Sequence, residues 1–130
     1  DHAFLNKEMT ACFGWRLNVS TQTKPRTVAN FQMQANGAEM LRLAVIFGRE
    51  EGIKICATIH DAILIEATLD ELEEQTAVMQ SRMAEASRLV LDGFELGSDA
   101  EYTRYPEAFG KRQELMWDHV QGVIGGRREH

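Results

Sequence analysis

Two apolar segments separated by only two residues constrain the fold of this 130-residue chain most strongly. Residues 53–59 (IKICATI) alternate like a half-buried strand, and residues 62–67 (AILIEA) form a second strand-forming run. Only His60 and Asp61 remain to connect them. Because a two-residue connection joins antiparallel strands, the sequence predicts a β-hairpin with Asp61 at its tip. His-Asp lacks the Asn-Gly chemistry usual in such turns, and local violations of this kind concentrate at functional sites.

Two long helices flank this hairpin in the sequence. The first is expected from Pro25 to about Arg49, because proline suits a first helical turn and apolar residues recur at helical spacing after it. The Asn36-Gly37 pair predicts a kink or a break in its middle. The second helix is expected from a capping box at residues 68–71 to the Asp-Gly pair at residues 92–93.

The remaining segments complete an α+β prediction. Residues 10–19 read as strands turning at Gly14, residues 94–105 as a further strand, and residues 107–120 as a last helix that Pro106 starts. We therefore expect one domain over residues 1–130, with an antiparallel sheet, helices packed mainly on one face, and frayed ends at residues 1–9 and 122–130.

The composition limits the cellular setting and the partners. Cys12 and Cys56 lie 44 residues apart without CxxC spacing, which indicates reduced thiols in a cytoplasmic protein and argues against a zinc site. No apolar run is long enough to cross a bilayer, so no membrane partner is expected. The net charge of −6 hides an asymmetry, because residues 1–49 carry six Lys/Arg against three acids and residues 68–101 carry two against nine. The first part could face phosphate, while the acidic part reads as a solvated helix face.

A polar stripe lies on the first predicted helix. Arg26, Asn30 and Gln34 stand at i, i+4 and i+8 and therefore share one helix face. They span about 12 Å of helix, close to the rise of three to four base pairs. Guanidinium and amide donors can reach the purine N3 and pyrimidine O2 acceptors that every Watson–Crick pair presents in the minor groove. Such a stripe would test base-pair geometry without reading sequence.

Asp61 is a candidate ligand for a hard divalent cation. A carboxylate held on a tight turn suits Mg²⁺, which prefers rigidly placed oxygen ligands. A two-metal site for phosphoryl transfer needs at least two acids. Glu66 lies five residues along the strand and faces the other way, and Asp99 and Glu101 lie on a poorly constrained segment. The second acid is therefore expected outside this chain, which opens on Asp1 without a starting methionine and reads as the tail of a longer protein.

Three segments together resemble the palm of family A DNA polymerases, the class typified by bacterial DNA polymerase I. The run FGWRL at residues 13–17 resembles their "FGRRL" strand, MQANGAE at residues 33–39 resembles "MQGTAAD", and Ile59-His60-Asp61 resembles the "VHDE" motif C. The three occur in the family's order. The resemblance covers roughly residues 10–105 and is most specific over residues 26–44 and 57–67.

This resemblance implies a palm-type sheet with a motif C hairpin and a DNA-directed DNA polymerase. Asp61 would be a catalytic Mg²⁺ ligand, His60 a catalytic residue contacting the primer terminus, and the stripe a DNA-binding surface; its members are Arg26, Asn30 and Gln34. The partners would be primer-template DNA, dNTP and the upstream fingers and palm segments of a cytoplasmic, bacterial or phage-type parent. Replication and repair both remain open as its role.

The chain also departs from the family pattern. Ala62 replaces the Glu beside the catalytic Asp, Gln32 replaces a Pro, and the run at residues 35–37 moves a glycine by two positions. The family's other metal-binding Asp and its nucleotide-binding Lys and Tyr would precede Asp1. The chain thus holds half of a site, and the isolated fragment is expected to be inactive.

Two other classes compete with this interpretation. A non-catalytic interaction module could keep the palm core for folding or partner binding. A metal phosphohydrolase of the His-Asp type would need several spaced ligands on helices, whereas the histidines here are scattered and one lies in a strand context; they are His2, His60, His119 and His130.

Overall fold

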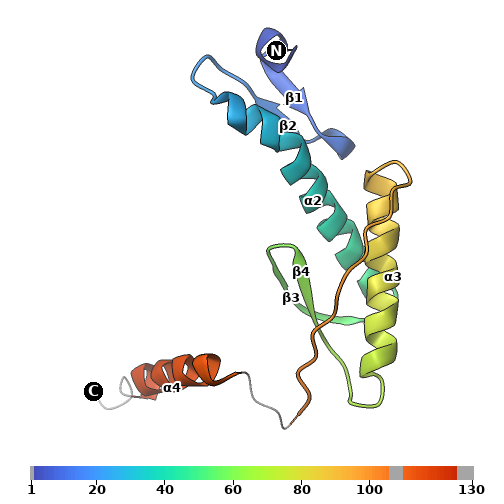
Figure 1. Cartoon of the computed structure of the whole chain (residues 1–130), viewed down its shortest axis with the longest axis vertical. Coiled ribbons are helices and arrows are strands. Elements are labelled where there is room, and N and C mark those ends of the chain that lie inside the picture. The colour runs from blue at the N-terminus through green and yellow to red at the C-terminus, as the bar shows by residue number, and fades with distance from the viewer. Residues whose placement is uncertain (1, 106–109, 126–130) are drawn as a thin grey trace. The chain divides into compact units, whose positions relative to one another are not determined.

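The computed structural model describes residues 2–105 and 110–125 and has the predicted α+β class (Figure 1). The chain divides into two compact units, residues 1–99 and residues 100–130, each of which is described by itself. The first unit contains α1 (His2–Asn6), β1 (Glu8–Thr10), the 3₁₀ turn η1 (Cys12–Gly14), β2 (Arg16–Asn18), α2 (Pro25–Glu50), β3 (Lys54–Ile59), β4 (Ala62–Glu66) and α3 (Leu72–Val90). The second unit contains α4 (Lys111–Gly125). The described strands form two separate antiparallel pairs, β1–β2 and β3–β4.

Helix α2 runs without interruption through Asn36-Gly37, so the predicted break is wrong. One interior glycine costs about 1 kcal/mol, which the hydrogen bonds and packing of a 26-residue helix outweigh. The helix ends in a Schellman motif: the Ile53 N–H donates to the Gly48 carbonyl, and the Gly52 N–H donates to the Arg49 carbonyl. Gly52 supplies the positive φ of 80° that this ending requires, and the chain then enters β3.

The predicted hairpin between residues 53 and 67 is confirmed. Strands β3 and β4 pair antiparallel, with Lys54 opposite Glu66 at the open end and Ile59 opposite Ala62 at the tip. The register shifts between Ile55 and Ala57, which marks a β-bulge. A bulge strengthens the local twist and fixes the register of a hairpin, so the tip is held in a defined orientation.

The core forms where α3 and the β3–β4 hairpin pack against the C-terminal half of α2. Its buried residues are Ala44, Ile53, Met79 and Ala86, and half-buried side chains surround them; these include Leu43, Phe47, Ile55, Ile63 and Ile65. Gly48 marks the closest approach. A Cβ there would lie 2.8 Å from the Met79 sulfur and 3.3 Å from Ile55 Cδ1. The absence of a side chain at this position is what allows α3 and the hairpin to approach α2.

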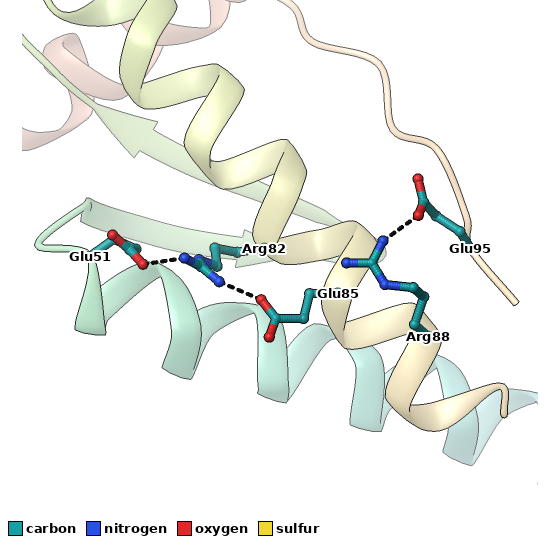
Figure 2. Close-up of polar contacts among 5 residues, drawn as sticks. All are labelled: Glu51, Arg82, Glu85, Arg88 and Glu95. Carbon is teal, nitrogen blue, oxygen red and sulfur yellow. Dashed lines mark hydrogen bonds and ion pairs between the residues drawn. The ribbon is translucent and has the colours of Figure 1, made fainter. Parts of the chain in front are cut away.

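Ion pairs join the ends of these elements (Figure 2). Figure 2 shows Arg82 of α3 between two carboxylates, Glu51 at the end of α2 and Glu85 one turn further along α3. Arg88 of α3 pairs with Glu95 in the segment that follows the helix. Such partly exposed pairs contribute modestly to stability; two of them connect α3 to the end of α2 and to the segment after α3.

Residues 94–105 form no strand, so the predicted strand is wrong. Backbone groups of this segment bond to side chains of α3 instead: the Leu96 N–H donates to Ser87 Oγ at 2.9 Å, and Gln80 Nε2 donates to the Ser98 carbonyl at 2.6 Å. The described strands pair only within their own hairpins, β1 with β2 and β3 with β4, and this segment joins neither pair.

The helix boundaries also differ from the predictions. The predicted capping box at residues 68–71 is wrong, because the Thr68 hydroxyl donates to the Glu71 carboxylate at 2.9 Å and no side chain caps the backbone of α3, which begins at Leu72. Residues 1–9 were expected to be frayed, but His2–Asn6 form α1 and Glu8–Thr10 form β1. The last helix spans residues 111–125 and not 107–120, while Pro106, residues 107–109 and the tail at residues 126–130 lie outside the described residues. None of the helices in the described ranges combines the length and apolar character needed to cross a bilayer.

Candidate functional site

His60 and Asp61 form the turn of the β3–β4 hairpin, and both are exposed. Neither side chain makes a hydrogen bond or an ion pair with the part of the chain that the structure describes. His60 has a φ of 55°, and Asp61 is not among the residues of positive φ. A positive φ at the first turn residue alone is the sign pattern of a type II′ turn, which normally takes glycine there. The Asp61 carboxylate is thus held at a tight turn and open to solvent, as predicted.

The left-handed backbone at His60 is a local strain. A non-glycine residue in this region costs roughly 1–2 kcal/mol, and histidine tolerates it better than most. Three other non-glycine residues share it, at turns of their own: Lys7, Phe13 and Asp92. The strain at His60 therefore supports a functional interpretation only together with the exposed carboxylate beside it.

The polar stripe lies on the first part of α2. Arg26, Asn30 and Gln34 are all exposed, and their side chains make no hydrogen bond or ion pair within residues 2–105 and 110–125. Ala44, which is buried in the core, follows Arg26 after about five helical turns and so shares its face. The stripe therefore lies on the same side of α2 as the core. It lies closer to the N-terminus of the helix, where the core no longer covers that side.

The two predicted segments are attached to different parts of α2. The β3–β4 hairpin packs near Leu43 and Phe47, and the stripe ends at Gln34, about 14 Å earlier along the helix axis. Figure 1 shows the hairpin beside the C-terminal half of α2. No hydrogen bond or ion pair joins Asp61 to the stripe among the described residues.

Glu66 forms an ion pair with Lys54 at the open end of the hairpin. Its carboxylate accepts a hydrogen bond from Lys54 Nζ at 2.6 Å. This bond and the charge of Lys54 lower the pKa of Glu66, and the same bond raises the pKa of Lys54. Glu66 therefore does not serve as a second carboxylate beside Asp61. Within the described ranges, no group of three or more His, Cys, Asp or Glu side chains is arranged to hold a metal ion.

A buried carboxylate that the sequence did not single out lies further along α2. Glu39 is 2% exposed, and its carboxylate accepts hydrogen bonds from the guanidinium of Arg42, one turn later. Burial raises the pKa of the Cys12 thiol, and the nearby Glu39 carboxylate raises it further. The 3₁₀ turn η1 packs against α2, and helical geometry places Glu39 about 180° around α2 from the stripe. In the sequence, only the i, i+3 spacing of Glu39 and Arg42 indicated that these two side chains could pair. Cys12 and Cys56 are both free cysteines.

No protein-family model, curated protein or solved structure matches this chain. The candidate site is therefore interpreted from its own residues and geometry.

Proposed function

We propose that this chain is the C-terminal part of the palm of a DNA-directed DNA polymerase of family A, in a cytoplasmic, bacterial or phage-type parent. In that parent it contributes to template-directed nucleotidyl transfer during replication or repair. The observation that carries the proposal is the His60-Asp61 turn, where a carboxylate without an internal partner stands exposed at the tip of a short hairpin. The resemblance of residues 59–61 to motif C supports the same conclusion.

Asp61 contributes one ligand to the proposed Mg²⁺ site. An exposed carboxylate on a tight turn suits this cation, but a two-metal centre needs more than one acid. The described residues hold no cluster that would complete it, because Glu66 is paired with Lys54. Residues 2–105 and 110–125 therefore do not fit a complete two-metal centre. In our proposal the missing carboxylate comes from the upstream palm.

The stripe is proposed to hold the primer-template duplex. Its donors are exposed and have no partners among the described residues, so they are available to the minor-groove acceptors of a base pair. Residues 1–49 carry six Lys/Arg against three acids, which favours an anionic partner on this part of the chain. His60, beside Asp61, is proposed to contact the primer terminus, and the upstream fingers and palm are proposed to bind the dNTP.

The test uses the chain joined to upstream fingers and palm segments. Asp61→Ala should abolish nucleotide incorporation and leave primer-template affinity nearly unchanged, because a metal ligand acts mainly in the transition state. Gln34→Ala should slow incorporation and weaken discrimination at a mismatched primer end by about 1–3 kcal/mol. Gln32→Ala is the matched control, since Gln32 is an exposed glutamine of α2 on the side away from the stripe.

Single-turnover kinetics on matched and mismatched primers separates the outcomes. A near-normal rate for Asp61→Ala, or equal behaviour of Gln34→Ala and Gln32→Ala, would refute the proposal. If the joined protein binds its upstream segments but never incorporates nucleotide, the chain is a non-catalytic palm-derived interaction module.

A further inference from the structure

The tip of the β1–β2 hairpin presents two aromatic side chains to solvent. Phe13 is 58% exposed and Trp15 is 60% exposed. Large aromatic side chains dominate cores and interfaces because of the area they bury, so a pair left open on one small turn is a candidate contact surface. Residues 11–16 are called the aromatic tip below.

Backbone hydrogen bonds hold the aromatic tip in place, and its conformation includes one strained residue. The Ala11 N–H donates to the Trp15 carbonyl at 2.8 Å, and the Gly14 N–H donates to the Ala11 carbonyl at 3.2 Å. Phe13 has a φ of 57°, in the left-handed region that disfavours a bulky side chain. Glycine would form the same turn more easily, so the fold alone does not call for an aromatic residue at position 13. Strained residues of this kind are retained where they serve a contact.

The charge around the tip favours an anionic partner. Arg16 follows Trp15 directly, and its side chain is 70% exposed, with the nearest carboxylate oxygen, on Glu8, at 3.9 Å. Residues 1–49 as a whole carry the excess of Lys/Arg described above. Among the described residues, Arg16 forms only a long, exposed ion pair with Glu8, so its guanidinium stays open to solvent. Exposed aromatic faces next to an exposed guanidinium suit single-stranded nucleic acid, because bases stack on the rings and the cation meets the phosphates.

We propose that Phe13 and Trp15 form a stacking platform for unpaired bases, with Arg16 contacting the backbone of the same strand. This inference rests on the proposed polymerase function, in which the unpaired strand is the template beyond the duplex. Cys12, in η1, lies near Glu39, on the face of α2 opposite the stripe. The platform and the duplex-binding stripe are therefore separate surfaces that can be tested independently.

The experiment uses the full chain with Trp117→Phe, which leaves Trp15 as the only tryptophan. Titration with oligothymidylate of about twelve nucleotides should quench the Trp15 emission, with an affinity that falls as salt rises. In anisotropy measurements with labelled oligothymidylate, Phe13→Gly combined with Trp15→Ala should lower the affinity about tenfold or more. Glycine accepts the positive φ at position 13, so circular dichroism should show an unchanged fold.

Two further variants separate stacking from a general loss of apolar surface. Trp15→Phe keeps an aromatic face and should retain most of the affinity. Leu64→Ala removes an exposed apolar side chain from β4 and should leave the affinity unchanged. The proposal is overturned if oligothymidylate does not quench Trp15, or if the double variant binds it normally. It is also overturned if the double variant instead loses a concentration-dependent dimer in sedimentation, because the tip would then be a protein contact.

A parallel measurement on blunt duplex DNA distinguishes this inference from the proposed function. If alanine at Arg26, Asn30 and Gln34 weakens duplex binding and the tip variant has no effect on the single strand, only the platform is wrong. If the tip variant weakens single-strand binding and the stripe variant binds duplex normally, the proposed duplex surface is wrong.

Discussion

Replacing His60 by glycine should stabilise the protein. His60 has a φ of 55°, which costs a non-glycine residue roughly 1–2 kcal/mol and costs glycine nothing. The greater backbone entropy of glycine in the unfolded chain removes roughly 0.5–1 kcal/mol of this gain. Since the His60 side chain is exposed and makes no described hydrogen bond, little else is lost. We expect the free energy of unfolding to rise by about 0.5–1 kcal/mol and Tm to rise by roughly 2–5 °C.

The neighbouring turn residue provides the matched control. Asp61 is equally exposed but has no positive φ, so Asp61→Gly relieves no strain and should lower the free energy of unfolding by about 0.5–1 kcal/mol. Urea denaturation followed by circular dichroism, with equal m-values for all three proteins, measures both changes. If His60→Gly is no more stable than the parent, or if both glycine variants shift stability in the same direction, the turn geometry at the candidate site is wrong. In the joined polymerase, His60→Gly should also slow incorporation, because the proposed contact to the primer terminus is lost.

Three further predictions concern packing, pH and metal. Gly37→Ala places its Cβ in open space and should stabilise α2 by about 1 kcal/mol. Gly48→Ala should be neutral or destabilising by up to about 2 kcal/mol, because its Cβ would lie 2.8 Å from the sulfur of buried Met79. Equal shifts of the urea midpoint in the two variants would contradict this prediction. The Lys54–Glu66 pair lowers the pKa of Glu66 from 4.5 and raises the pKa of Lys54 from 10.5, so its contribution to stability is lost as pH falls through the Glu66 pKa or rises through the Lys54 pKa. Glu66→Gln should therefore flatten both the acid and the alkaline limb of a stability–pH profile measured at low salt. Unchanged limbs would show that the pair contributes nothing to stability. Mg²⁺ or Mn²⁺ should bind at Asp61 with a Kd in the millimolar range at best, a binding energy of about 4 kcal/mol, and micromolar affinity by NMR titration would show a complete site within the chain.

The elements that the sequence predicted correctly are those with short-range causes. The β3–β4 hairpin follows from two strand-forming runs with only His60 and Asp61 between them, and the start of α2 follows from Pro25 at its first position. The exposure of the stripe follows from helical spacing of polar residues alone. Each of these patterns is complete within a few residues, so no distant part of the chain is needed to interpret it.

Other features depended on residues far apart in the sequence. Residues 94–105 have strand-forming composition but join neither described sheet, and hydrogen bonds to Ser87 and Gln80 hold part of the segment along α3 instead. The burial of Glu39, on the helix that η1 packs against, likewise arises from packing between elements. Local propensities differ by about 1 kcal/mol or less per residue, and tertiary packing and available hydrogen-bond partners exceed that difference, so only the folded structure decides these positions.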